Sequence, residues 1–376
     1  MTKSRANATA EAAKGDLRAG SGTNTTTILP VGTDGQTLVA NSATASGLGW
    51  NQNFAAGKNA IINGAFNVWQ RGTSFTPSGE TYVADRFYVN RDGTGTACTV
   101  SQQTFTAGTA PVSGYEGTYF LRYNQTNAGT SQTYAVLAQR IEDVRTFAGQ
   151  TITVSFWAKA ASGYTMNNVQ VSQSFGSGGS TAVTTSGSSP VITTSWARYS
   201  MSITLPSIAG KTIGSGNYLA LYLYSPANTI FTVDFWGVQL EAGSVATAFQ
   251  TATGTLQGEL AACQRYGIEL NPNGNAYASL GSGYATSGTA FYPTISLPVP
   301  LRTTPTSVTA SAAGNWRVFN SLAVPTVTGF AINAGGCGSN TVSLAVTVST
   351  GLTNGSFYAL EGNNNTAARL FISAEL

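Results

Sequence analysis

Apolar and polar residues alternate along several stretches of the chain, which is the pattern of β-strands with one buried face. In Thr151–Ala160 the side chains of Ile152, Val154 and Phe156 share one face, and mostly polar residues share the other. Residues 198–205 alternate in the same way. We therefore expect both segments to be strands that pack one face against a core.

Two further segments extend this β-rich region. Residues 218–224 are apolar on both faces, so we expect a central strand there, and residues 230–240 predict a long closing strand. Glycine, serine and asparagine separate the short strands between residues 59 and 251, which is typical of a β-sandwich or jelly roll. The sequence shows no repeat with a period of about 20–50 residues, which disfavours a β-helix or a propeller.

Residues 255–266 (TLQGELAACQRY) predict one helix between two β regions. Leu256, Leu260 and Cys263 follow the spacing of one helical face, and we expect that face to be buried. Thr255 is placed to cap the start of the helix, and Gly267 is placed to end it.

The segment 269–376 predicts a second β unit. Residues 341–349 alternate, with Val342, Leu344, Val346 and Val348 expected on one buried face. Residues 291–301 contain three prolines, so they predict either an edge strand or a strand with an irregular tail.

Before residue 57 the pattern is different. Two β-type runs, 27–31 and 37–40, flank Asp34 and Gly35, and an Asp-Gly pair between such runs predicts a hairpin. A lone hairpin is marginally stable, so we expect its apolar residues to pack against other chains. Residues 1–20 carry six charges, and a short helix at 6–13 would order only against a partner.

These patterns divide the chain into four parts. We expect an N-terminal stem and docking segment (1–56), a jelly-roll domain (57–252), a linker helix (253–268) and a C-terminal β-sandwich tip (269–376). The predicted fold class is all-β.

Composition limits the functions that this fold can serve. Charged residues make up only 9% of the 376 residues, and 18 Lys and Arg against 15 Asp and Glu give a net charge of +3. Nucleic-acid binding requires clustered basic residues, so we expect no nucleic-acid partner. The C-terminal unit is especially poor in charge, which buried subunit interfaces would explain.

Histidine is absent, so the chain cannot form a Ser-His-Asp or Cys-His nucleophile or a His-ligated zinc site. The three cysteines, Cys98, Cys263 and Cys337, lie far apart and are expected to be buried and unpaired. No signal peptide opens the chain, and no run of about 18 apolar residues would span a membrane. We expect a protein made in the cytoplasm and released in an assembled particle.

Several motifs resemble those of bacteriophage fibres. Residues 27–50 resemble a segment near the N-termini of phage tail-fibre and other virion appendage proteins. Residues 59–87 resemble the opening of a jelly-roll domain of phage fibres, which is itself similar to carbohydrate-binding modules. Later matches are FWAKA at 156–160, WARY at 196–199 and VQLEAG at 238–243, and ELAACQRY at 259–266 resembles the helix that follows.

This resemblance implies a virion protein, in the phage tail or a head appendage, that assembles as a homotrimer. It also implies a structural calcium ion held by the opening Asn-Gly-x-Phe segment, here Asn63, Gly64 and Phe66, and by Asp234 of the last strand. The family often has an acidic residue after the Phe, and this chain has Asn67, which weakens a site for a hard cation.

Sugar recognition uses exposed aromatic rings next to amides and carboxylates. The candidates for binding a host surface glycan are Trp69, Tyr82, Tyr88, Trp157 and Trp236. The alternative for each is packing in the core or in a subunit interface. Two loops of the C-terminal unit, 271–275 and 363–366, are further candidates, although turn formation alone explains their composition.

Without histidine, hydrolysis of a glycan would need two carboxyl groups roughly 5–10 Å apart. The pairs nearest in sequence are Glu80 with Asp85 and Glu142 with Asp143, but adjacent strand residues face opposite ways. Asp85 and Arg86 are expected to form a structural ion pair. We therefore expect a fibre protein that is not an enzyme and requires no cofactor, with a head-decoration protein or a depolymerase as alternatives.

We also expect a polarity along the fibre. Residues 1–50 would bind other virion proteins, and residues 269–376 would point away from the particle, where loops vary without disturbing assembly.

Overall fold

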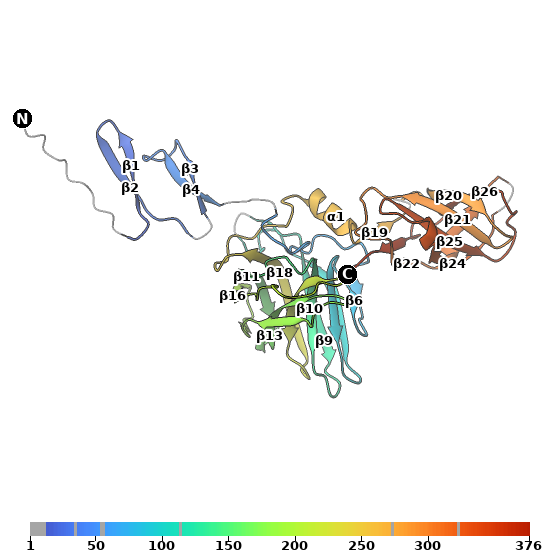
Figure 1. The fold of residues 1–376 in the computed structure, drawn as a ribbon, viewed down its shortest axis with the longest axis horizontal. Helices are drawn as coiled ribbons and strands as arrows, with labels where there is room; N and C mark the ends of the chain where they lie inside the picture. The colour runs from blue at the N-terminus through green and yellow to red at the C-terminus, as the bar shows by residue number, and fades with distance from the viewer. Residues whose placement is uncertain (1–12, 34–35, 53–56, 113–114, 272–273, 322–323) are drawn as a thin grey trace, which may run out of the picture.

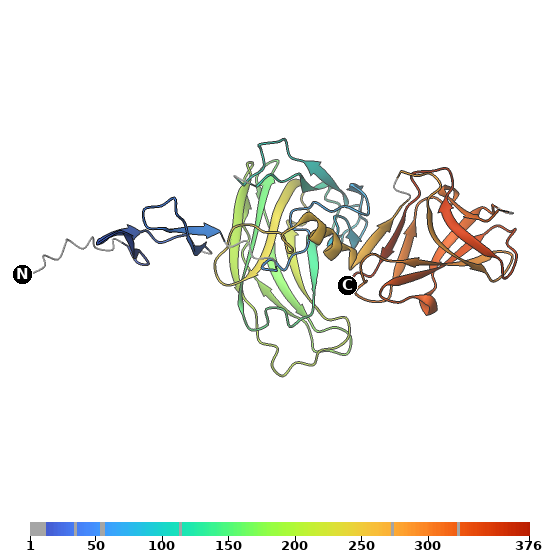
Figure 2. The same cartoon turned by 90° about the horizontal axis from the view of Figure 1, so that it is seen from above.

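The computed structural model describes residues 13–33, 36–52, 57–112, 115–271, 274–321 and 324–376. Two N-terminal hairpins precede a large β-sandwich, which is followed by a helix and a C-terminal β domain (Figures 1 and 2). The described residues contain one α-helix, two 3₁₀ turns (Ala313–Asn315 and Ala334–Gly336) and otherwise strands and loops. The predicted all-β class is confirmed, and no described helix is long and apolar enough to cross a membrane.

The large sandwich consists of two six-stranded antiparallel sheets. The first sheet has the order β14 (Val183–Ser186), β13 (Asn168–Ser174), β17 (Tyr218–Ser225), β10 (Ala135–Glu142), β7 (Phe87–Arg91) and β6 (Thr81–Tyr82). The second has the order β16 (Ala197–Thr204), β11 (Thr151–Ala160), β18 (Phe231–Ala242), β9 (Tyr119–Asn127), β8 (Ala97–Thr104) and β5 (Ser74–Phe75). A small pair, β12 (Tyr164–Thr165) with β15 (Val191–Ile192), lies beside them.

The main core lies between these two sheets. Ile152, Val154 and Phe156 of β11 are fully buried there, as the alternation predicts. The predicted central strand at 218–224 is β17, which lies between β13 and β10. The predicted closing strand is β18, the last strand of the sandwich in sequence, and it pairs with β11 and β9 in the middle of its sheet.

The helix α1 (Leu256–Gln264) begins at its predicted cap, because the Gly258 N–H donates to Thr255 Oγ1 at 3.0 Å. The predicted buried face is only partly correct. Cys263 is buried, but Leu256 and Leu260 are 64% and 38% exposed. The carboxylate of Glu259 is buried instead, since it accepts hydrogen bonds from two segments before the helix.

The C-terminal domain packs a three-stranded sheet against a six-stranded one. The three-stranded sheet has the order β19 (Gly267–Leu270), β27 (Leu370–Ser373) and β22 (Ser307–Ala310). The six-stranded sheet has the order β23 (Trp316–Phe319), β26 (Phe357–Gly362), β20 (Ser279–Ala285), β21 (Ala290–Ser296), β25 (Thr341–Val348) and β24 (Val327–Ile332).

Two predictions for this domain concern strand β25 and the proline-rich segment at 291–301. The alternating residues of β25 are buried as expected. The proline-rich segment takes the second of its two predicted forms, a strand with an irregular tail, because β21 lies between β20 and β25 and the chain after it is irregular. An interior proline fits here because Gly283 lies opposite Pro293, and a side chain at Gly283 would collide with the backbone of Tyr292.

The N-terminal region forms two hairpins with a pairing that differs from the prediction. β2 (Thr25–Leu29) pairs with the earlier β1 (Leu17–Gly22), and β3 (Gln36–Ala40) pairs with the later β4 (Leu48–Gln52). Asp34 and Gly35 lie outside the described residues. The predicted helix at 6–13 also lies outside them, except for its last residue, Ala13. Among the described residues before position 53, Ala19 is the one buried hydrophobic residue, so neither hairpin has a core of its own.

Candidate functional site

The outer face of the first sheet carries a group of tyrosines, which we call the tyrosine face. Alternate residues of β17 are leucines that enter the core, so Tyr222 and Tyr224 point to the other side of the sheet. The tyrosine face consists of Tyr82, Tyr88, Tyr134, Tyr222 and Tyr224 around Val136 and Ala138.

The strand register places two tyrosines on either side of an alanine. Tyr88 of β7 lies directly opposite Ala138 of β10, and Ala138 lies directly opposite Tyr222 of β17. The tyrosines cover the small alanine, because Ala138 is 1% and Tyr88 2% exposed. A hollow of about 300 Å³ lies on this face, and its aromatic lining consists of Tyr88, Tyr134, Tyr222 and Tyr224.

The rings of the tyrosine face are held against one another. The centroids of Tyr82 and Tyr88 are 5.5 Å apart, and those of Tyr222 and Tyr224 are 5.7 Å apart. Burial raises the pKa of Tyr88 and the pKa of Tyr222 above the usual tyrosine value. The hydroxyls of Tyr88 and Tyr222 also interact with each other, so the two side chains meet above Ala138.

One end of the hollow is closed by a charged group. Arg140 Nη2 donates to Glu80 Oε2 at 2.7 Å, and the guanidinium carbon lies 4.6 Å from the Tyr88 ring centroid. The same carbon lies 5.2 Å from the Tyr218 ring centroid. Arg140 is therefore fixed between two aromatic rings, with its charge balanced by Glu80.

Neutral polar side chains complete the lining. These are Asn90, Gln170, Ser172 and Thr184. The site combines aromatic surface with neutral donors and acceptors, which suits a ligand that has both apolar C–H faces and many hydroxyl groups.

Two of the residues predicted to bind sugar, Tyr82 and Tyr88, lie on this face. Tyr88 lines the hollow but is only 2% exposed, and half-buried Tyr82 lies outside the lining, so neither is the open ring that was expected. Trp69 lies elsewhere: its Nε1 donates to the Phe66 carbonyl at 2.6 Å, and its ring lines a groove of about 720 Å³ next to α1 and the C-terminal domain. The structure thus separates Trp69 from the tyrosines.

The remaining two candidates, Trp157 and Trp236, are buried. They point to the outer face of the second sheet, as predicted, but Trp236 is 0% and Trp157 only 9% exposed. Phe105, Tyr115 and Phe249 cover them, with ring centroids 4.9–6.1 Å from Trp236. The prediction that these two rings are exposed is wrong, because loops cover this part of the sheet.

The side chains and carbonyl expected to bind calcium, those of Asn63, Asp234 and Phe66, have other partners and do not fit a calcium ion. Asp234 accepts from Arg122 Nε and Nη2 at 2.8 and 2.9 Å, so cationic side chains occupy its carboxylate. Asn63 Oδ1 accepts from the Val68 N–H, and the Phe66 carbonyl accepts from Trp69. Asn67 Oδ1 is buried without a hydrogen-bond partner, but one amide oxygen falls far short of the six to eight oxygens that calcium takes.

The predicted carboxylate pairs are engaged in other interactions. Glu80 pairs with Arg140, Glu142 with Arg265, and Asp143 with Arg145. Asp85 accepts from the backbone and side chain of Gln70, and Arg86 pairs with Glu375, so the expected Asp85–Arg86 ion pair is wrong. No group of three or more Cys, Asp or Glu among the described residues is arranged to hold a metal ion.

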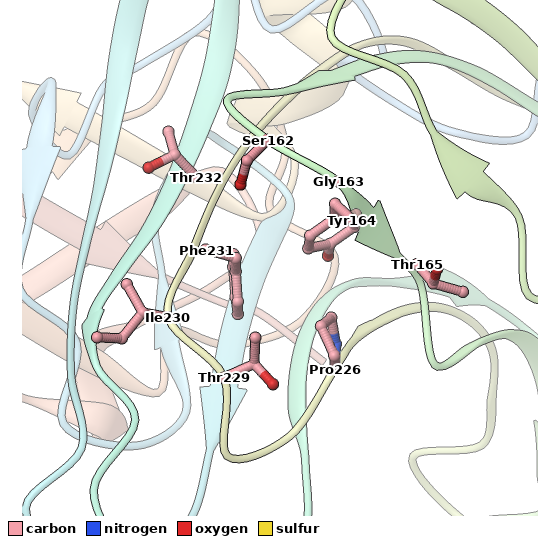
Figure 3. Close-up of a pocket in the computed structure, with 9 residues that line it drawn as sticks. All are labelled: Ser162, Gly163, Tyr164, Thr165, Pro226, Thr229, Ile230, Phe231 and Thr232. Carbon is pink, nitrogen blue, oxygen red and sulfur yellow. The ribbon is translucent and has the colours of Figure 1, made fainter.

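A second, smaller hollow lies at one end of the large sandwich. Figure 3 shows Tyr164 and Phe231 facing this space together with Thr229 and Pro226. Its volume is about 180 Å³, and Tyr164 is fixed because its hydroxyl donates to Ser225 Oγ at 2.6 Å. This hollow is neutral and lacks the group of open rings found on the tyrosine face.

Tyr134, Tyr222 and Tyr224 are not among the sugar-binding residues predicted from the sequence. The sequence does contain a pattern that predicts Tyr222 and Tyr224 on one face, because the alternation within residues 218–224 places tyrosines at positions 218, 222 and 224. No comparable signal marked Tyr134, which lies in the described loop just before β10.

No protein-family model matches the chain, and no curated protein matches it. Solved structures match with low identity. The enzymatically active domain of tailspike protein 4 from bacteriophage CBA120 is 13% identical over 50% of this chain, with a TM-score of 0.30. This match spans only 22% of that tailspike chain.

Two other similar structures are carbohydrate-binding modules. A family 11 module of a cellulosomal cellulase from Clostridium thermocellum is 13% identical, with 45% of this chain and 98% of the module covered and a TM-score of 0.28. A xylan-binding domain from Paenibacillus barcinonensis is 12% identical, with 51% and 98% covered and a TM-score of 0.29.

Proposed function

We propose that this protein binds a neutral glycan of a host surface on its tyrosine face. The observation that carries the proposal is the hollow of about 300 Å³ that is lined by the half-buried rings of Tyr134, Tyr222 and Tyr224. The C–H faces of a sugar ring pack on such rings, while the sugar hydroxyls bond to Asn90 and Gln170.

The charges around the hollow favour a neutral ligand. Glu80 and Arg140 are the charged residues of its lining, and they neutralise each other. An ionic ligand would have to break this pair, whereas a neutral sugar leaves it intact.

Titration of the full chain with a panel of neutral oligosaccharides of glucose, xylose, mannose and galactose tests the proposal. We expect saturable binding of at least one sugar, weakened about tenfold or more in Tyr222→Ala and Tyr224→Ala. Tyr284→Ala is the matched control, because Tyr284 is 58% exposed in the C-terminal domain. Equal affinity in all variants would remove the tyrosine face as the site.

We propose that binding is not followed by hydrolysis. Among the residues that the structure describes, Glu80 is the one carboxylate that lines the hollow, and two carboxyl groups are needed to cleave a glycosidic bond. Incubation with host envelope polysaccharide should therefore release no reducing ends. Release that persists in highly purified protein would favour the depolymerase alternative.

We further propose that the chain is a subunit of a phage virion fibre, with three copies joined at the N-terminal hairpins. In support, Leu17 and Leu38 are each 37% exposed on hairpins that have no core, and Val31, between the two hairpins, is 50% exposed. Antibody labelling of intact particles distinguishes a tail fibre from a head decoration, and particles without label would contradict the virion role.

A further inference from the structure

The outer face of the second sheet carries a row of charges across three neighbouring strands. Lys159 of β11 lies directly opposite Asp234 of β18, and Asp234 lies directly opposite Arg122 of β9. These side chains line a hollow of about 190 Å³, which we call the basic pocket. It lies on the opposite sheet from the tyrosine face.

The basic pocket has one more positive than negative charge. The Asp234 side chain is 4% exposed and lies beneath the two cations, whereas Arg122 is 37% and Lys159 32% exposed. Glu375 also holds two cations, but Arg71 and Arg86 there are only 13% and 1% exposed. The surplus charge of the basic pocket therefore faces solvent.

Donor groups remain free in this pocket. Arg122 donates to Asp234 through Nε and Nη2, and in the part of the chain that the structure describes its Nη1 makes no hydrogen bond. Lys159 Nζ lies 3.6 Å from Asp234 Oδ2 and makes no hydrogen bond to any described residue. Two cationic donors are thus available to one anionic group.

Aromatic rings hold the two cations in place. Lys159 Nζ lies 5.2 Å from the Trp196 ring centroid and 5.6 Å from that of Phe120. The Arg122 guanidinium carbon lies 6.0 Å from the Phe120 centroid. Fixed side chains lose less conformational entropy when they bind a ligand, and half-buried Trp196 offers a ring beside the pocket.

We propose that the basic pocket binds one anionic sugar residue of a glycan, with Arg122 and Lys159 contacting its carboxylate or phosphate group. The volume is below the 300–1,000 Å³ of pockets for drug-sized molecules, which fits a single sugar ring. The exposed hydroxyl of Thr194 lines the same pocket and is able to bond a sugar hydroxyl. This site is separate from the tyrosine face and does not depend on it.

Calorimetric titration of the full chain at low ionic strength tests this site. The Tyr222→Ala, Tyr224→Ala double variant serves as the starting protein, so that the tyrosine face does not contribute. The probes are trigalacturonate, galactose 6-phosphate and neutral galactotriose. We expect one acidic probe or both to bind, at least about tenfold more tightly than galactotriose, and to bind more weakly as salt is added.

Single substitutions then locate the binding. Lys159→Gln should weaken the acidic probe about tenfold or more, because a charged hydrogen bond is lost. Lys211→Gln removes the same charge from an exposed loop residue and should leave the affinity unchanged. Equal weakening in both variants, no saturable binding of either acidic probe, or equal binding of galactotriose would overturn the proposal.

Discussion

Arg86 of the large sandwich forms an ion pair with Glu375, which follows the last strand of the C-terminal domain. The Arg86 side chain is 1% exposed and that of Glu375 is 7% exposed. Arg71 Nη2 also donates to Glu375 at 3.1 Å, and the Tyr266 ring centroid lies 3.4 Å from the Arg86 guanidinium carbon. A buried electrostatic contact thus joins the large sandwich to the C-terminal domain.

Glu375→Ala should uncouple the two domains. The substitution leaves Arg86 buried without its anion, and breaking one side of a buried pair costs about 3–5 kcal/mol. Differential scanning calorimetry should show a lower melting temperature and two separated transitions in place of one. Asp143→Asn, in an ion pair whose side chains are 60% and 44% exposed, is the control and should change stability by less than about 1 kcal/mol. A single unshifted transition in Glu375→Ala would contradict the coupling.

Glu259→Ala should destabilise the start of the large sandwich. The buried carboxylate accepts from the Asn63 N–H at 2.7 Å and from the Thr253 N–H at 2.8 Å, so it ties helix α1 to two other segments. Each buried N–H left without an acceptor costs about 1–3 kcal/mol. Urea unfolding measures this loss, and Glu259→Gln, which keeps one acceptor oxygen, should recover part of it.

Asp92 predicts a pH-dependent contribution to stability near the tyrosine face. Burial raises the pKa of Asp92, but hydrogen bonds from Thr133 and Tyr134 outweigh it and hold the pKa below the usual aspartate value. A carboxyl group whose pKa is lowered in the folded state stabilises the fold above its unfolded pKa of about 3.9, and the contribution disappears as the pH falls through the folded pKa.

Asp92→Asn should therefore be less stable than the natural chain at pH 6, and the difference should shrink as the pH approaches 2. Chemical unfolding at both pH values measures it. A difference that stays constant with pH would show that the Asp92 charge does not matter. The same substitution should weaken the anchor of Tyr134, since Asp92 Oδ1 accepts from the Thr133 and Tyr134 N–H groups at 2.8 and 3.0 Å.

The sequence predicts correctly those features that depend on a single strand. Alternation in Thr151–Ala160 correctly identified the buried face, because successive side chains point to opposite sides of any sheet. It also placed Trp157 on the outer side. Whether that side is open depends on loops such as the one carrying Phe105, and the strand's own sequence holds no information about them.

The candidate sites depend on register between distant strands. The row of Tyr88, Ala138 and Tyr222 comes from three strands, and so does the row of Arg122, Lys159 and Asp234. Pairing of this kind is set by the whole sheet, so single-strand periodicity predicts the tyrosines but not their neighbours. The calcium role of Asp234 follows from the family resemblance alone, whereas the register places Asp234 between Lys159 and Arg122.

The N-terminal hairpins predict that several copies of the chain assemble. Two-stranded sheets are marginally stable alone, and β1–β2 and β3–β4 leave Leu17 and Leu38 partly exposed, as is Val31 in the segment between them. Three copies packed side by side would remove these side chains from water. Analytical ultracentrifugation of the full chain at micromolar concentration should therefore give three times the 38.8 kDa mass of one chain.

A double substitution, Val31→Ser with Leu38→Ser, should shift this trimer towards monomer, because it removes apolar surface from the proposed contact. Val324→Ser is the matched control, since Val324 is 54% exposed in the C-terminal domain. Neutral-glycan binding by the tyrosine face should persist per chain in the dissociated variant, as the face lies within one subunit. A natural chain that sediments as a monomer would contradict the trimer, and a dimer would contradict its threefold order.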